Sequence, residues 1–268
     1  MFIIQGGKEE TMVGIDLSGR VALVVGVANK HSIAWAIAQK LAEAGCQIIL
    51  TYQNERFEKS VKELAGQINC PLTIECDVTN SEQVLAVFEA VRTEVGFLDF
   101  LIHSLAFAPA QEWESSFLET SREGFSQALD ISAYSLIPLS REFAKISRPG
   151  GSIITLTFQA SERVFPVYKV MGPAKAALEN SVKYLACELG ERGIRVNAIS
   201  AGPISTLAAR GIPGFIPGRQ DWRERAPLKE DISQGDVANT ALFLCSGLSK
   251  VITGEIIHVD AGYHIMGT

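Results

Sequence analysis

Residues 20–34 read Arg20-Val-Ala-Leu-Val-Val-Gly-Val-Ala-Asn-Lys-His-Ser-Ile-Ala34, and this stretch decides the fold class. Its first part, Val21 to Val25, is short, apolar and rich in β-branched residues, and Gly26 ends it. Such a run is typical of a strand buried on both faces of a parallel sheet. Apolar residues then recur at helical spacing over residues 32–44, and Gly45 follows as a C-terminal cap. The stretch therefore predicts a buried strand, a glycine turn and an amphipathic helix.

The same alternation continues along the chain. Six further strands are expected at 46–52, 72–76, 97–103, 152–158, 194–200 and 255–260. Helices are expected at 55–68, 81–95, 121–146, 171–190 and 236–246. Strands separated by helices run parallel, and right-handed crossovers place the helices on both faces of the sheet. The sequence therefore predicts an α/β fold, a doubly wound Rossmann-type parallel sheet of seven strands with first-half order 3-2-1-4.

One long stretch, residues 201–235, lacks this regularity and contains several prolines and glycines. A loop of this length inside a compact domain usually covers a ligand site or is disordered. Because it follows the carboxyl end of a strand, a substrate-binding lid is favoured. We expect an N-terminal extension over residues 1–14, a single domain over 15–268, and the lid at about 203–235.

Composition excludes several classes of function. The 268 residues include 24 basic and 30 acidic side chains, so the net charge of −6 argues against a nucleic-acid partner. No apolar run approaches the roughly 20 residues of a membrane helix, and the first residues have no basic region typical of a secretory signal. Five cysteines without a C-x-x-C pair suit a reducing compartment, and the four histidines show no metal-ligand spacing. We expect a cytoplasmic protein with no membrane insertion and no metal.

The turn after the first strand is a candidate dinucleotide site, because ligands of such sheets bind beyond the carboxyl ends of the strands. The turn is not G-x-G-x-x-G. Gly26 nevertheless permits a tight turn, and Ser32 and Ile33 begin a helix whose N-terminus suits a pyrophosphate. An ordinary strand-to-helix turn is the alternative interpretation.

The tips of the second and third strands complete this candidate site. Gln53 stands near the strand tip where a ribose-binding carboxylate is usual, and Asp77 and Val78 follow the third strand, where they could contact adenine. Arg56 could pair with a 2′-phosphate but also suits the surface of a helix. NADH is therefore favoured over NADPH. An ordinary turn with no ligand contact is the alternative interpretation of Asp77 and Val78.

A tyrosine and a lysine form the candidate catalytic pair. Pro173 lacks an N–H and fits only in the first turn of a helix, so the helix begins near residues 169–172 with Tyr168 at its start. Lys175 lies seven residues later, about two turns on and on nearly the same face. A phenol and an ammonium group can thus point into one crevice. A packed Tyr and a surface Lys are the alternative.

Four motifs carry a resemblance to a known family: Gly26-x5-Ser32-x-Ala34, His103-Ser-Leu-Ala-Phe-Ala108, Tyr168-x6-Lys175 and Arg195-Val-Asn-Ala-Ile-Ser-Ala-Gly-Pro-Ile204. The chain resembles the bacterial NADH-dependent enoyl-[acyl-carrier-protein] reductases, a divergent branch of the short-chain dehydrogenase/reductase superfamily. The match extends from about residue 15 to 267. Ordinary members of the superfamily carry Tyr-x3-Lys, so the longer spacing here is specific.

The resemblance implies conjugate reduction of a trans-2-enoyl thioester, the last step of the fatty-acid elongation cycle. It implies that Tyr168 stabilises and protonates the enolate, that Lys175 holds the nicotinamide ribose, and that Ala108 and Phe158 lie beside the substrate with Tyr168. The cofactor would be lined by Gly26, Ser32, Ile33, Gln53, Asp77, Val78, Leu105, Lys175, Ile204, Ser205, Thr206, Leu207 and Ala208. A homotetramer is implied, and acyl-carrier protein would dock on basic residues near the lid, with Arg210, Arg219, Arg223 and Arg225 as candidates. Solvated surface charges are the alternative interpretation of these arginines.

The sequence departs from the family pattern at four positions: Phe158 replaces a second Tyr, Val167 and Lys169 replace common Asn residues, and Ser205 replaces a common Arg. A weakly active or non-catalytic dinucleotide-binding paralogue is therefore one alternative. A carbonyl or 3-ketoacyl reductase of the same superfamily is the other. It is disfavoured by the Tyr–Lys spacing and by Thr155, which stands where such enzymes carry Ser. The ring of His103 is expected to point away from the site.

Overall fold

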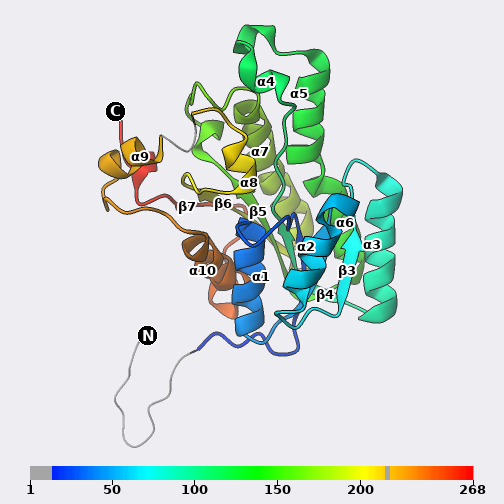
Figure 1. Ribbon diagram of the computed structural model, residues 1–268. Helices are drawn as coiled ribbons and strands as arrows, with labels where there is room; N and C mark the ends of the chain where they lie inside the picture. The colour runs from blue at the N-terminus through cyan, green and yellow to red at the C-terminus, as the bar shows by residue number, and fades with distance from the viewer. Residues whose placement is uncertain (1–13, 215–217, 268) are drawn as a thin grey trace, which may run out of the picture.

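The computed structural model describes residues 14–214 and 218–267, so the expected N-terminal extension lies, apart from Gly14, outside the described residues. The described residues form a seven-stranded sheet in the order β3-β2-β1-β4-β5-β6-β7, with every neighbouring pair parallel (Figure 1). The strands are β1 (Val21–Val25), β2 (Gln47–Tyr52), β3 (Leu72–Glu75), β4 (Leu98–His103), β5 (Ser147–Thr157), β6 (Arg195–Ala201) and β7 (Ile256–Val259). The predicted strand order 3-2-1-4 is confirmed.

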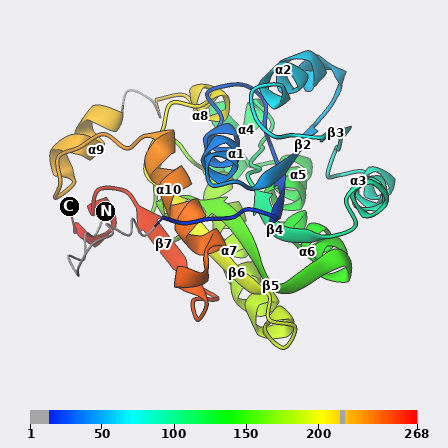
Figure 2. The same cartoon turned by 90° about the horizontal axis from the view of Figure 1, so that it is seen from below.

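Helices cover both faces of the sheet (Figure 2). The α-helices are α1 (Ile33–Glu43), α2 (Glu55–Ala65), α3 (Ser81–Glu94), α4 (Gln111–Glu114), α5 (Arg122–Leu129), α6 (Leu136–Ile146), α7 (Met171–Gly190), α8 (Leu207–Arg210), α9 (Arg219–Arg225) and α10 (Gln234–Cys245). Apolar residues of α1 and α10 belong to one buried cluster, those of α3 and α6 belong to a second cluster, and α7 contributes its first turn to the first cluster and its later turns to the second. The sheet therefore separates two hydrophobic layers, and the strand residues that feed both layers are buried.

The strand order reverses at β1: β2 and β3 lie on one side of it, and β4 to β7 lie on the other. Val24 of β1 is paired with Leu50 of β2 on one side and with Ile102 of β4 on the other. The crossovers on the two sides of this point diverge, which leaves room beyond the carboxyl ends of β1 and β4. This edge of the sheet positions the candidate site.

The long helix predicted over residues 121–146 is wrong in one respect, because a five-residue π-helical turn, Asp130–Tyr134, interrupts it. The amide of Ser135 reaches back five residues to the carbonyl of Asp130. Pro138 has no N–H to give to the carbonyl four residues earlier, and it falls in the first turn of α6, where that loss costs least. The wide turn carries Ser132 toward the segment after β4, where its hydroxyl bonds Phe107, and Ser135, directly after the turn, bonds the buried His103.

Two further expectations require correction. β5 begins at Ser147 and runs through Gly150 and Gly151 instead of starting after them. Gly150 adopts a φ of +85°, so the glycine bends the strand without ending it. The expected lid is also less irregular than predicted, since it contains the short helices α8 and α9. In the part of the chain that the structure describes, no helix is long and apolar enough to cross a membrane.

Candidate active site at the carboxyl ends of β1, β4 and β5

The turn after β1 packs closely against the segment that follows β4. Gly26 has a φ of +105°, and a Cβ added there would lie 2.1 Å from the carbonyl oxygen of Ser104 and 3.2 Å from the Leu105 side chain. Only glycine fits this position. The Ser32 hydroxyl accepts hydrogen bonds from the amides of Ala28 (3.2 Å) and Asn29 (3.1 Å). The hydroxyl thus closes the turn upon itself instead of capping α1, and it leaves the start of α1, at Ile33, facing the same edge.

The predicted adenosine-binding residues follow β2 and β3 at the same edge. Gln53 is exposed immediately after β2, while Asp77 and Val78 are half-buried after β3. A hydrogen bond from the Cys76 amide to the Tyr52 carbonyl (2.8 Å) holds the two strand ends together. The Asp77 carboxylate accepts from the amide (2.9 Å) and hydroxyl (2.7 Å) of Thr79, so it also orders its own turn.

Lys175 is buried beside the carboxyl ends of β4 and β5. Its side chain lies on α7 and is only 3% exposed, and its ammonium donates to the carbonyl of Leu156 at 2.8 Å and to that of Leu105 at 3.5 Å. Burial lowers the pKa of Lys175 from 10.5 to about 8, against the opposing effect of Glu179 one turn later. Glu179 itself accepts a hydrogen bond from the Thr157 hydroxyl at 2.6 Å. The lysine therefore bridges the ends of β4 and β5 and is poised to lose its charge just above neutral pH.

Tyr168 lies in the turn that leads into α7. Its amide donates to the Phe165 carbonyl (2.8 Å), and its carbonyl accepts from the Met171 amide (3.0 Å), so the backbone around the phenol is ordered on both sides. The residue is 7% exposed, and burial raises the pKa of the phenol. The hydroxyl therefore stays protonated as a hydrogen-bond donor at every pH near neutrality. Together with Lys175 it brings a phenol and an ammonium group to one edge of the sheet.

Aromatic rings surround this phenol. The ring of Phe158 lies 4.8 Å from that of Tyr168 and 5.0 Å from that of Phe165, centroid to centroid. Trp113 approaches Tyr168 edge-on at 6.3 Å. From the expected lid, Trp222 of α9 stacks on Phe158 at 5.8 Å and on Tyr263 at 3.7 Å. Phe158 thus lies between Trp222 of α9 and the phenol of Tyr168 and joins them through apolar contact.

His103 is completely buried at the end of β4, held away from the crevice between two hydroxyls. Its Nδ1 lies 2.8 Å from the Thr155 hydroxyl and its Nε2 lies 2.8 Å from that of Ser135. The Ser135 hydroxyl donates to the Ile131 carbonyl (2.7 Å), so it accepts from Nε2, and Nδ1 in turn accepts from Thr155. Burial and the charge of Lys175 lower the pKa of His103 to about 3, so the ring is neutral. The hydroxyl of Thr155 is therefore committed to this ring.

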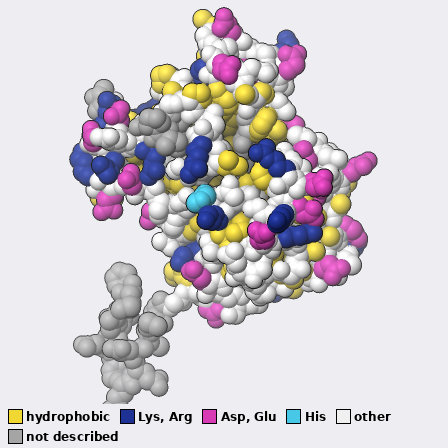
Figure 3. Space-filling model, viewed as in Figure 1, with side chains coloured by type: hydrophobic (Ala, Val, Ile, Leu, Met, Phe, Trp, Pro, Cys, Tyr) yellow, Lys and Arg dark blue, Asp and Glu magenta, His cyan; other side chains and the backbone are white. Residues whose placement is uncertain are grey.

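The segment after β4 forms a second wall of the crevice. The hydroxyl of Ser132, on the π-helical turn, bonds both the amide (3.0 Å) and the carbonyl (3.2 Å) of Phe107. These bonds fix the backbone beside Ala108, which is buried, as is Leu105 in part. Apolar side chains gather below α4 on this face of the molecule (Figure 3).

The remaining cofactor residues predicted by resemblance, residues 204–208, follow β6 at the same edge. Ile204 is buried, Ser205 and Thr206 are half-buried, and Leu207 and Ala208 are exposed. Thr206 caps α8, accepting from the Ala209 amide at 3.1 Å. The segment is thus an ordered entry into the expected lid.

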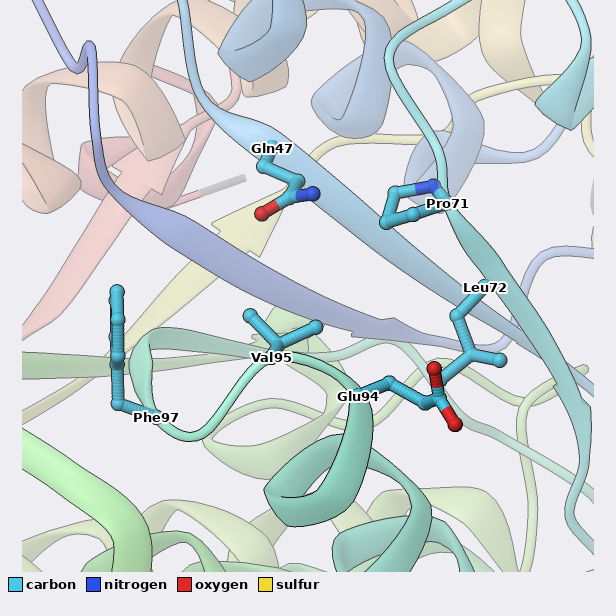
Figure 4. Close-up of a pocket in the computed structure, with 6 residues that line it drawn as sticks. All are labelled: Gln47, Pro71, Leu72, Glu94, Val95 and Phe97. Atoms are coloured by element: carbon cyan, nitrogen blue, oxygen red, sulfur yellow. The ribbon is translucent and has the colours of Figure 1, made fainter.

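Four residues beside the site were not singled out as site residues from the sequence: Trp113, Lys169, Glu179 and Trp222. Glu179 could have been found, because it lies one helical turn after Lys175. The others reach the site through long-range packing, which no local pattern records. A separate hollow, lined by Gln47, Pro71, Leu72, Glu94, Val95 and Phe97 (Figure 4), lies where β2, β3 and β4 begin, at the opposite edge of the sheet. It takes no part in the candidate site.

Comparison with known proteins places these features in a family. The family model described as "Enoyl-(Acyl carrier protein) reductase" matches residues 26–264. The chain is 50% identical over 253 residues to the enoyl-[acyl-carrier-protein] reductase [NADH] FabI of Bacillus cereus, a match that covers 94% of this chain and 99% of that protein. The fold superposes with a TM-score of 0.92 on a crystal structure of the Bacillus cereus reductase with NADP+ and indole naphthyridinone, at 50% identity and covering 94% and 99% of the two chains. A reductase (NADH) structure from Aquifex aeolicus gives a TM-score of 0.91 at 44% identity, with the same coverage.

Proposed function

The chain belongs to the enoyl-[acyl-carrier-protein] reductase family and reduces enoyl thioesters with NADH in fatty-acid synthesis, and we propose that Tyr168 and Lys175 carry this reaction. The observation that supports this assignment is the burial of both side chains at the one edge of the sheet where the glycine turn opens.

The glycine turn fits a dinucleotide. At Gly26 a Cβ would meet the carbonyl of Ser104, so the glycine lets the turn pack against the segment after β4, and the Ser32 hydroxyl holds the turn in shape. The helix α1 begins at this turn, and a helix N-terminus suits a pyrophosphate. Gln53, Asp77 and Val78 lie where an adenosine would end, and Leu105 and residues 204–208 lie on the way to Lys175. When bound, NADH supplies the hydride that reaches the β-carbon of the substrate.

Tyr168 acts on the other end of the conjugated system. As the β-carbon gains the hydride, negative charge collects on the thioester oxygen, and a donor aimed at that oxygen lowers the barrier. The Tyr168 hydroxyl is a donor with a raised pKa, so it keeps its proton until charge develops. Lys175 holds the nicotinamide ribose and favours negative charge nearby. Protonation of the α-carbon completes the saturation, and Ala108 and Phe158 line the acyl chain.

Carbonyl reduction is the less favoured reaction. The superfamily's carbonyl reductases carry a serine thirteen residues before the tyrosine, and here Thr155 stands there, fully buried and bonded to His103. Its hydroxyl is turned into the core and cannot meet a substrate carbonyl. A non-catalytic role is disfavoured because Phe158 replaces only a hydroxyl and leaves Tyr168 ordered.

The choice of NADH over NADPH follows from the second strand. Gln53 offers no positive charge to a 2′-phosphate, and Arg56 is exposed, with its guanidinium 5.5 Å from the ring centroid of its neighbour Phe57. The guanidinium is thus held on the surface of α2, so NADPH gains little there. We expect NADH to bind more tightly than NADPH.

Acyl-carrier protein is the proposed carrier, docking on the basic surface of α8 and α9 (Figure 3). Arg210, Arg223 and Arg225 are exposed there, while Asp231 partly neutralises Arg219 and Arg223 at 3.5 and 3.6 Å. An acidic carrier helix would be attracted to this surface. Arg225→Glu should therefore raise KM for the carrier-bound substrate and leave KM for the CoA thioester unchanged.

We also propose a homotetramer with a single domain from residue 15 onward and a lid at about 203–235, working in the cytoplasm. Large apolar side chains are exposed along α5, the π-helical turn, α6 and α7, and they support an interface: Phe125, Tyr134, Ile137 and Tyr184. All five cysteines are free, which suits a reducing compartment. Light scattering of the purified protein tests the oligomeric state.

The test of the reaction compares two thioesters. NADH oxidation is followed at 340 nm with a crotonyl thioester and, separately, with a 3-ketoacyl thioester. Turnover of the crotonyl thioester alone supports the proposal. Turnover of only the keto substrate would identify a carbonyl reductase, and turnover of neither with NADH still bound would identify a non-catalytic protein.

A further inference from the structure

Lys169, the residue that follows Tyr168, has an unusual backbone. It adopts a φ of +40°, in the left-handed region that residues with a Cβ rarely occupy. Asparagine or glycine would adopt this conformation at lower cost. A lysine kept in a strained conformation beside the catalytic phenol indicates that its side chain contributes something a shorter one cannot.

That contribution is visible in the contacts of the ammonium group. Lys169 Nζ donates to the carbonyl of Trp113 and to the carbonyl of Ser115, the latter at 2.5 Å. Both carbonyls belong to the end of α4, more than fifty residues away in sequence. Hydrogen bonds from a charged donor are stronger than neutral ones, and two of them from one half-buried group fix the segment firmly.

The clamped segment is a wall of the active site. The ring of Trp113 meets the ring of Tyr168 edge-on at 6.3 Å. The helix α4 is also anchored without Lys169, because the buried carboxylate of Glu112 accepts a hydrogen bond from the hydroxyl of Ser121 at 2.5 Å. The near end at Phe107 is held by Ser132. Without Lys169, the two turns would keep only the ring contact between Trp113 and Tyr168 and would lose both hydrogen bonds that join them.

We infer that Lys169 is a positioning residue, which clamps the end of α4 over Tyr168 through Trp113 and thereby sets the affinity for the enoyl substrate. The inference rests on the proposed role of Tyr168. It assigns no chemistry to Lys169, whose ammonium is engaged by the two carbonyls. It assigns to Trp113 the contact through which the clamp acts.

Lys169→Asn separates this role from a purely structural one. Asparagine relieves the left-handed strain but is too short to reach either carbonyl. The variant should therefore remain folded at the assay temperature, while KM for a crotonyl thioester rises about tenfold. KM for NADH should change less than about twofold, because the clamp lies on the substrate side. Lys169→Arg, which keeps a charged donor of sufficient length, should restore most of the affinity.

A double-mutant cycle tests the route through Trp113. If Lys169 acts through the ring of Trp113, the double variant Lys169→Asn/Trp113→Leu should have the same KM for the enoyl substrate as the more strongly affected single variant. Arg163→Met is the matched control, because Arg163 holds the same loop from the other side through the carbonyls of His264 and Met266. Its effect should add to that of Trp113→Leu.

Three results would overturn the inference: an unchanged enoyl KM in Lys169→Asn, equal changes in the KM values for the enoyl substrate and NADH, or full additivity with Trp113→Leu. Failure of the proposed function is distinguishable, since the parent protein itself would then not turn over the crotonyl thioester.

Discussion

The charge of Lys175 should limit cofactor binding at alkaline pH. Burial lowers the pKa of this ammonium to about 8. A group with that pKa is roughly half charged at pH 8 and about one-tenth charged at pH 9. If only the charged form holds the ribose hydroxyls, kcat/KM for NADH falls about tenfold for each pH unit above 8. Tyr168 does not contribute to this decline, because burial raises the pKa of its phenol away from the range.

The free energy of unfolding should rise over the same pH range in which NADH binding falls, because both depend on the charge of Lys175. The charged form of Lys175 is penalised in the folded protein, where its pKa is about 8, and not in the unfolded chain, where it is 10.5. The penalty is fully present below pH 8 and disappears as pH rises to 10.5, so over this range the free energy of unfolding of the parent gains about 3 kcal/mol relative to a Lys175→Met variant. Loss of NADH binding through this window is therefore not a sign of unfolding.

The assay measures kcat/KM for NADH from pH 7 to 9.5 at constant ionic strength with saturating crotonyl thioester, alongside urea unfolding of the parent and Lys175→Met. The Lys175→Met protein should show a low value that is independent of pH in this range. A flat profile for the parent through pH 9.5 refutes the reasoning, as does a decline with the same midpoint in Lys175→Met.

Two other predictions concern the glycine turn and the replaced tyrosine. Gly26→Ala places a Cβ 2.1 Å from the Ser104 carbonyl at a φ of +105°. The variant should lose about 2–4 kcal/mol of stability, measured by urea unfolding, and most NADH binding, measured by fluorescence titration. Gly190→Ala, whose Cβ meets nothing within 4 Å, is the control, and equal effects of the two substitutions would contradict the role given to Gly26. Phe158→Tyr adds a hydroxyl to a ring 4.8 Å from Tyr168 and should retain or raise kcat with the crotonyl thioester, whereas abolished turnover would show that the pocket has been misinterpreted.

Local sequence patterns predicted the elements that build the site, and the reasons are physical. α7 begins at Met171 as predicted, because Pro173 fits only a first helical turn, and β1 ends at Val25 before the glycine that the turn requires. The resulting edge of the sheet brings Gly26, Leu105 and Lys175 together. The roles of the individual residues at that edge remain predictions, and the experiments above test several of them.

What local pattern could not predict depends on contacts distant in sequence. The π-helical turn can be understood only from Pro138 together with the tertiary contacts of two serines. Ser132 bonds Phe107, and Ser135 bonds His103. The ring of Trp113 and the ammonium of Lys169 meet beside Tyr168 across more than fifty residues. The contact of Trp222 with Phe158 joins residues more than sixty positions apart in the sequence. No periodicity in the sequence records such pairs.

The central claim is that the Tyr168 hydroxyl stabilises the developing enolate. The most direct measurement is kcat of Tyr168→Phe with NADH and a crotonyl thioester, together with the Kd for NADH. Because the substitution removes one donor aimed at the oxyanion and keeps the ring, kcat should fall about 10²- to 10³-fold while Kd changes less than about threefold. A kcat equal to that of the parent would contradict the assignment of Tyr168.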